Sequence, residues 1–84
     1  MSDTKDWNSY TNTGVYYFDA KAAEAPNAAG LGYPYGVMLV FRANSRVMMQ
    51  MAFTHQAYSG TNAMFRVYFN FGSASPWSSW REFS

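Results

Sequence analysis

The residues best suited to chemistry stand near the C-terminal end, where aromatic rings alternate with arginine. Arg66 lies within an aromatic run, and Trp77-Ser78-Ser79-Trp80-Arg81 follows a short break rich in Gly, Ser and Pro. A guanidinium plane can stack over an indole face as a cation–π pair. Apolar sugar faces also pack on flat rings while fixed donors satisfy the sugar hydroxyls. Arg66 and Trp80 are therefore candidate ligand-binding residues, and the alternative is that this cluster closes the domain and orders its C-terminal end.

A second group of candidate ligand-binding residues stands in expected loops and turns. Tyrosine combines a large ring with a hydroxyl at low entropic cost, and asparagine offers both a donor and an acceptor. Loop side chains are less committed to packing than those in strand interiors. The candidates are Tyr33, Tyr35, Tyr58, Asn27 and Asn62. The long loop 19–35 is the best candidate for recognition, and the alternative is that its tyrosines pin the loop onto the domain.

Little in the sequence indicates catalysis or metal binding. His55 is the single histidine, and no Gly-x-Ser-x-Gly nucleophile motif accompanies it. Glycoside hydrolysis usually needs two carboxylates held across a cleft. The two glutamates, Glu24 and Glu82, stand in a loop and beside the C-terminus. We expect a non-enzymatic protein with no catalytic residue, no metal and no cofactor, and we interpret His55 as a solvated residue at a strand end.

Composition narrows the choice of partners. The chain has 84 residues, no cysteine and a net charge of +1, with 20% aromatic and 13% charged residues. Scattered cations make no basic footprint for nucleic acid or an anionic membrane, and no apolar run reaches membrane-spanning length. We also expect no signal peptide. A marginal core without disulfides, together with few charges, favours a surface covered by a sister subunit.

Residue alternation predicts an all-β domain of five or six short antiparallel strands with at most one helical turn. Strands are expected at 15–18, 36–42, 47–54, 65–71 and 77–83. Segment 20–25 has high helix propensity, but it is short and stops at Pro26. Two tryptophans three residues apart cannot share a face of a regular strand. Either Ser78-Ser79 forms a bulge or the two rings serve opposite faces.

The odd-numbered face of the sheet is expected to point inward. Between residues 47 and 54 the odd positions are wholly apolar, while the even positions are mixed. Met48, on the mixed side, is expected to point outward, where it could contact another subunit. The predicted core consists of Val15, Tyr17, Val37, Leu39, Val47, Met49, Met51, Phe53, Phe65, Val67, Phe69 and Phe71.

The order of these elements resembles the pyocin-knob family, small domains in the tail fibres of contractile phages and R-type pyocins. The resemblance covers nearly the whole chain, and its strongest part is a Trp-x-x-Trp motif after an aromatic-Arg strand. Departures are Asn27, which follows the proline, and an additional Gly-Leu-Gly-Tyr-Pro-Tyr segment before Gly36. The positions that carry the resemblance are Asp6 with Asn8, Gly14-Val15-Tyr16, Ala25-Pro26, Gly36-Val37-Met38-Leu39-Val40, Gln50, Phe65-Arg66 and Trp77-Ser78-Ser79-Trp80.

The resemblance implies one knob-like domain over residues 1–84, in a homotrimeric fibre of a virion or pyocin tail that is extracellular after lysis. Family members recognise bacterial surface polysaccharide, or act as spacers in the fibre. We therefore expect a receptor-binding or architectural fibre module with no nucleic-acid partner and no membrane insertion. The alternatives are a purely structural spacer or trimerisation domain, a polysaccharide depolymerase fragment, and a single-stranded nucleic-acid binder with an aromatic platform.

Overall fold

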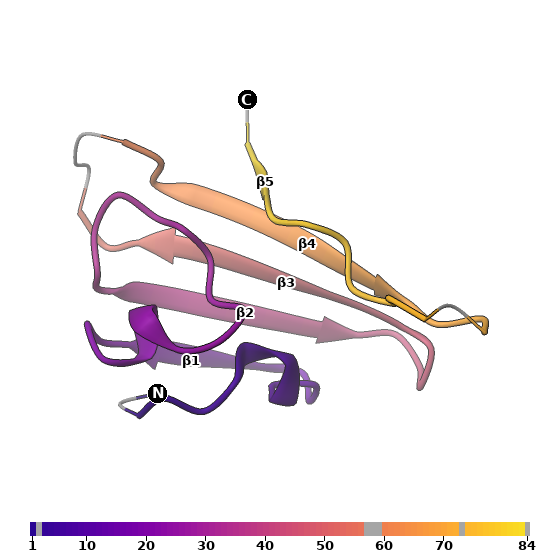
Figure 1. Ribbon diagram of the computed structural model, residues 1–84. Coiled ribbons are helices and arrows are strands. Elements are labelled where there is room, and N and C mark those ends of the chain that lie inside the picture. The colour runs from indigo at the N-terminus through magenta and orange to yellow at the C-terminus, as the bar shows by residue number, and fades with distance from the viewer. Residues whose placement is uncertain (2, 57–59, 73, 84) are drawn as a thin grey trace.

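One five-stranded antiparallel sheet, in the order β1-β2-β3-β4-β5, runs through the molecule (Figure 1). The computed structural model describes residues 1, 3–56, 60–72 and 74–83. Neighbouring strands follow one another along the chain, so the sheet is a simple meander. The predicted all-β domain of short antiparallel strands is confirmed. Its strands are β1 (Gly14–Phe18), β2 (Gly36–Arg42), β3 (Val47–Thr54), β4 (Ala63–Phe69) and β5 (Arg81–Glu82).

Two short 3-10 helices precede and follow β1. The first, η1 (Trp7–Ser9), was not expected, and the second, η2 (Ala22–Glu24), falls where one helical turn was predicted. The Asp19 carboxylate accepts hydrogen bonds from the backbone amides of Lys21 and Ala22, at 3.0 and 3.1 Å, and so starts η2. Pro26 prevents its continuation. Among the described residues, no helix has the length and apolar character needed to cross a membrane.

The N-terminal segment and the loop between β1 and β2 lie over one face of the sheet, which we call the closed face (Figure 1). Trp7 is fully buried there. Small side chains from the loop let its backbone approach the sheet closely. The buried apolar residues are Trp7, Phe18, Ala22, Ala25, Ala29, Met38, Val40, Met48 and Ala52. The core therefore comes from even-numbered strand residues and from the segments that cover them.

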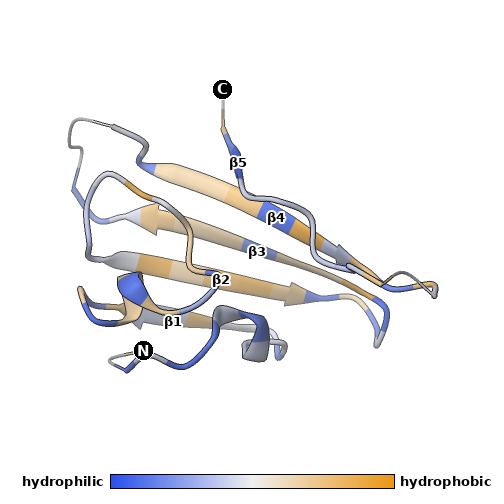
Figure 2. Cartoon of the chain, in the orientation of Figure 1, coloured by the Kyte–Doolittle hydropathy of each residue, from blue (hydrophilic) through white to orange (hydrophobic). Residues whose placement is uncertain are grey.

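The predicted direction of the alternation is wrong. Met48, expected outward, is buried, whereas Val15 and Phe69, expected in the core, are 73% and 58% exposed. The physical reason lies in Gln50 and Arg66, the polar residues that made the even set look solvent-facing. Both are buried, and they hydrogen bond to each other. Hydrophilic bands accordingly interrupt β3 and β4 midway, within otherwise apolar strands (Figure 2).

The opposite side of the sheet, which we call the open face, consists of the odd-numbered residues of β1 to β4. Several of them are large and exposed, including Phe41 and Val67. The predicted core residues are therefore mostly on this face. Its thirteen members are Val15, Tyr17, Val37, Leu39, Phe41, Val47, Met49, Met51, Phe53, Ala63, Phe65, Val67 and Phe69.

The C-terminal segment pairs with β4 irregularly. Trp77 forms an isolated bridge with Tyr68, and Arg81 in β5 pairs with Phe65. The C-terminal segment uses four residue steps where β4 uses three, so it carries one extra residue, as in a β-bulge. Ser78 occupies this irregular stretch, and its hydroxyl accepts a hydrogen bond from the Val67 amide at 3.0 Å. The predicted strand over 77–83 is thus reduced to a bridge, a bulge and the short β5.

Candidate functional site

The structure separates the predicted ligand-binding residues into two groups. Arg66, Trp80 and Asn27 meet beside the closed face, where they share one network of contacts. Tyr33, Tyr35 and Asn62 belong to the end of the sheet where β3 finishes. Tyr58 lies outside the described residues.

The Arg66 side chain is held in the interior by Gln50. Only 3% of Arg66 is exposed, and its Nε and Nη2 atoms donate to Gln50 Oε1 at 2.9 and 2.7 Å. Gln50 Nε2 in turn donates to the backbone carbonyls of Trp7 and Tyr10, at 2.8 and 2.9 Å. One amide side chain thus links two strands to the N-terminal segment that covers them.

Two tryptophan rings enclose the same guanidinium. The Arg66 guanidinium carbon lies 4.0 Å from the Trp77 ring centroid and 4.7 Å from that of Trp80. Both indoles reach Arg66 because the bulge between them brings the two rings to one side of the strand. Burial lowers the pKa of Arg66 to about 10, and the nearby Asp6 carboxylate opposes that shift. The group stays charged at neutral pH, and its position matches the interpretation that this cluster closes the domain.

Asn27 fastens the long loop to both ends of the chain. Its backbone adopts a left-handed φ of 61°, which asparagine tolerates better than most residues. Asn27 Nδ2 donates to Asp6 Oδ1 at 2.9 Å, and its carbonyl accepts from Trp80 Nε1 at 3.0 Å. Asp6 Oδ1 also accepts from the Asn8 amide at 2.8 Å. The two hydrogen bonds that Asp6 accepts, from the Asn27 side chain and the Asn8 amide, lower its pKa, with a smaller contribution from the charge of Arg66.

Acid should destabilise the domain partly through Asp6. Because the pKa of Asp6 in the folded chain lies below its ordinary value of 3.8, the unfolded chain binds more protons near that pH. Its contribution to stability is complete above pH 3.8 and is lost as the pH falls through the folded-state pKa. We expect the free energy of unfolding to fall more steeply in wild type than in Asp6→Asn, measured by urea denaturation from about pH 6 to about pH 2. Parallel curves for the two proteins would contradict this role.

A second cluster of rings forms where β1 and β3 end, and we call its members Tyr17, Tyr33, Tyr35 and His55 the tyrosine–histidine cluster. The centroid of the His55 ring lies 5.4 Å from that of Tyr33, 6.3 Å from Tyr35 and 6.4 Å from Tyr17. Tyr33 and Tyr35 are themselves 5.8 Å apart. Tyr17 and His55 are exposed and the other two are half-buried. The rings therefore offer aromatic surface to solvent without belonging to the buried core.

Backbone hydrogen bonds position this cluster. The His55 amide donates to the Tyr35 carbonyl at 3.3 Å, and the Gly32 amide donates to the Thr61 carbonyl at 2.6 Å. The loop is thereby attached to the connection between β3 and β4. A groove of about 190 Å³ includes one ring of the cluster, Tyr33. Its lining residues are Phe18, Ala23, Ala29, Gly30, Leu31, Gly32, Tyr33 and Pro34. Rings beside a groove of small residues suit stacking against a flat, partly apolar ligand.

Tyr17 and His55 were not among the predicted ligand-binding residues. Tyr17 was placed in the core, and His55 was interpreted as a solvated strand-end residue. In a meander, the end of β1, the start of β2 and the end of β3 lie side by side at one end of the sheet. Applying that topology to the predicted strands would have brought Tyr17, Tyr35 and His55 together.

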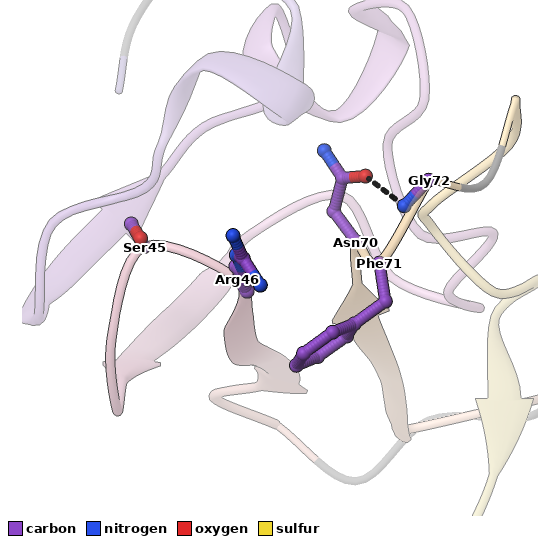
Figure 3. Close-up of a pocket in the computed structure, with 5 residues that line it drawn as sticks. All are labelled: Ser45, Arg46, Asn70, Phe71 and Gly72. Atoms are coloured by element: carbon purple, nitrogen blue, oxygen red, sulfur yellow. Dashed lines mark hydrogen bonds between the residues drawn. The ribbon is translucent and has the colours of Figure 1, made fainter.

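A second concavity, of about 470 Å³, lies at the opposite end of the sheet (Figure 3). The turn between β2 and β3 and the segment after β4 form its walls. The Arg46 guanidinium carbon lies 5.1 Å from the Phe71 ring centroid, and Asn70 Oδ1 accepts from the Gly72 amide at 3.4 Å. Its lining residues are Ser45, Arg46, Asn70, Phe71 and Gly72. None of them was predicted to bind a ligand.

Comparisons with protein-family models, curated proteins and solved structures find no match to this chain. The resemblance to knob domains therefore rests on the quoted residues alone. Within the described part of the chain, no group of three or more His, Cys, Asp or Glu side chains is arranged to hold a metal ion.

Proposed function

We propose that this chain is a non-enzymatic knob-type module of a phage or pyocin tail fibre that contacts bacterial surface polysaccharide. The observation that carries the proposal is the tyrosine–histidine cluster, a set of accessible rings on a backbone attached to the sheet. Such rings can stack on the apolar faces of sugars, while tyrosine hydroxyls bond to sugar hydroxyls. The resemblance to tail-fibre knobs supports the same class of ligand.

The chemistry of the cluster favours sugars over nucleic acid. Single-stranded nucleic-acid sites combine stacking rings with a basic groove that follows the phosphates. The cluster contains no lysine or arginine, and the groove beside it is lined by apolar, glycine, tyrosine and proline residues. Uncharged or weakly charged polysaccharide is therefore the better fit.

The placement of the carboxylates supports a binding role rather than hydrolysis. Among the described residues, four of the five acidic side chains accept hydrogen bonds from their own chain. Asp19 starts η2, and Asp6 fixes Asn8 and Asn27. Residues used in this way are poor candidates for the paired acid and base of a depolymerase. The four are Asp3, Asp6, Asp19 and Glu82.

Replacing Tyr33 and Tyr35 together by alanine is expected to weaken polysaccharide binding about tenfold or more. Each lost ring contact should cost about 1 kcal/mol of binding free energy. The measurement is binding to a bacterial glycan array, followed by titration of the glycans that bind, with an oligonucleotide shift assay in parallel. The control is the Tyr33→Phe/Tyr35→Phe protein, which keeps both rings and should retain most of the binding.

Two results would contradict this site. If the alanine double mutant binds like wild type while a folded Trp80→Ala protein does not, the site lies at the Trp–Arg cluster. If wild type binds no bacterial glycan, the recognition role is wrong.

A purely structural role, as a spacer or trimerisation domain of the fibre, is the second candidate function. The open face favours it, because the largest exposed apolar patch of a domain is often a contact surface. The two functions are compatible, because Tyr33, Tyr35 and His55 lie at one end of the sheet and outside the open face. Tyr17 is the one ring that the cluster shares with the open face. In both, we propose assembly as a homotrimer.

A further inference from the structure

The open face is continuous and apolar. The strand register places its side chains in rows across the sheet, such as Val15, Leu39, Met51 and Phe65. Phe41, Met49 and Val67 form the next row. None of its thirteen members is charged, and only Tyr17 carries a polar atom in its side chain. The closed face, by contrast, buries Gln50 and Arg66. The surface left uncovered is thus more apolar than the core itself.

The dimensions of the open face match a subunit interface. Four strands about 4.8 Å apart and five to eight residues long, at about 3.3 Å per residue, span a plane of roughly 430 Å². Side-chain relief raises the accessible area further. Two such faces in contact would bury about 900 Å² of plane, and the side-chain relief brings this area near the lower limit of about 1,000 Å² for specific protein interfaces.

We propose that the open face is the contact surface between copies of this chain. Domains are usually built from two packed layers, and this chain supplies a single sheet. Among the described residues, the Phe83 ring packs against Phe53 and Phe65 on the open face. Other large side chains of that face, such as Phe41 and Phe69, remain exposed. Every copy offers the same apolar surface. Two copies would pack these faces together about 10 Å apart, whereas three copies would turn them toward a shared three-fold axis. This surface would be the contact between subunits of the homotrimer proposed above. Only the number of copies, three, rests on the proposed function.

Charge favours a second copy over other partners. A face without charged side chains can meet itself without repulsion, whereas unrelated partners are usually selected through complementary charges or hydrogen bonds. The charged residues lie at its borders, where Arg46 is over Phe71 and Arg81 pairs across from Phe65 in β5. An apolar centre with a charged rim is the usual anatomy of an interface between subunits.

The first test is the solution mass. We expect light scattering at micromolar concentration to give a multiple of the monomer mass for wild type. Val67→Glu places a charge in the middle of β4, where Val67 is 38% exposed, and should leave a folded monomer or weaken association at least tenfold. The matched control is Thr4→Glu, which adds the same charge at an exposed residue of the N-terminal segment and should keep the wild-type mass.

A second measurement keeps the proposal falsifiable if Val67→Glu fails to fold. Phe69, which is exposed on the open face, is replaced by the photoreactive p-benzoylphenylalanine, and the control carries the same group at Thr4. Illumination should yield covalent oligomers from position 69 and few or none from position 4.

Each outcome decides the point. A monomeric wild type, or a Val67→Glu protein that keeps the wild-type mass, overturns the interface, as does equal cross-linking from positions 69 and 4. A wild-type dimer that Val67→Glu dissociates supports the interface and contradicts the trimer. If no glycan binds on the array, the solution masses and the cross-linking yields would be unaffected. The recognition role and the subunit interface can therefore be disproved independently of each other.

Discussion

Trp7→Ala is expected to unfold most of the domain, because it removes the largest fully buried side chain. The Trp7 ring lies 5.3 Å from Phe18 and 5.8 Å from Trp80, and its Nε1 donates to the Ala22 carbonyl at 2.9 Å. Replacing a buried tryptophan by alanine costs about 3–5 kcal/mol. Small domains have free energies of unfolding near the lower end of about 5–15 kcal/mol, so this loss would remove most of the domain's stability. Urea denaturation followed by far-UV circular dichroism measures it.

The control for this prediction is Trp7→Phe. Phenylalanine keeps much of the aromatic contact with Phe18 but cannot donate to the Ala22 carbonyl, so the expected loss is about 1–3 kcal/mol. The order of stability should therefore be wild type, Trp7→Phe and then Trp7→Ala. A Trp7→Ala protein that melts within a few degrees of wild type would show that the closed face is not the core.

The strands could be predicted from the sequence, but the side of the sheet that forms the core could not. Alternation fixes which residues share a face, and turn residues fix where strands end, so β2 and β3 were predicted with their observed limits. Alternation does not say which face is covered. That choice depends on Trp7 and on the small residues of the loop, which pack only against the even-numbered side. The pairing of Gln50 with Arg66 depends on the register of β3 and β4, which residue spacing within either strand does not reveal.

The candidate site was predicted in part. The tyrosines at positions 33 and 35 were selected because they stand in a loop, and the structure brings them together at one end of the sheet. Asn27 was selected for the same reason, yet its hydrogen bonds all serve the chain's own fold. Loop position alone does not distinguish a side chain that is available to a ligand from one whose hydrogen bonds stabilise the fold. The difference is that Asn27 adopts a left-handed backbone next to η1 and Trp80, which only the folded arrangement shows.

The buried pair of Gln50 and Arg66 should contribute strongly to stability, because the Gln50 amide bonds to two backbone carbonyls and to one guanidinium. Gln50→Leu keeps the volume but leaves Arg66 charged, buried and without the Gln50 oxygen as acceptor. It also removes the side-chain donor to the Tyr10 carbonyl and one of the two donors to the Trp7 carbonyl, which still accepts from the Tyr10 amide. Removing one partner of a buried charge typically costs about 3–5 kcal/mol. We expect Gln50→Leu to lose stability of that size, measured by urea denaturation against wild type.

The Gln50→Leu/Arg66→Met protein tests the reason for that loss. With the charge removed as well, no unpaired guanidinium remains in the interior, although the two carbonyls still lack the hydrogen bonds that Gln50 donated. The double mutant should therefore be more stable than Gln50→Leu by about 1–3 kcal/mol, the typical cost of leaving a buried polar group unsatisfied. If adding Arg66→Met lowers stability further instead, the stacking of Arg66 between Trp77 and Trp80 is worth more than the cost of its unpaired charge. That outcome would make the two cation–π contacts of Arg66, rather than the amide, the interactions that hold the C-terminal segment against the sheet.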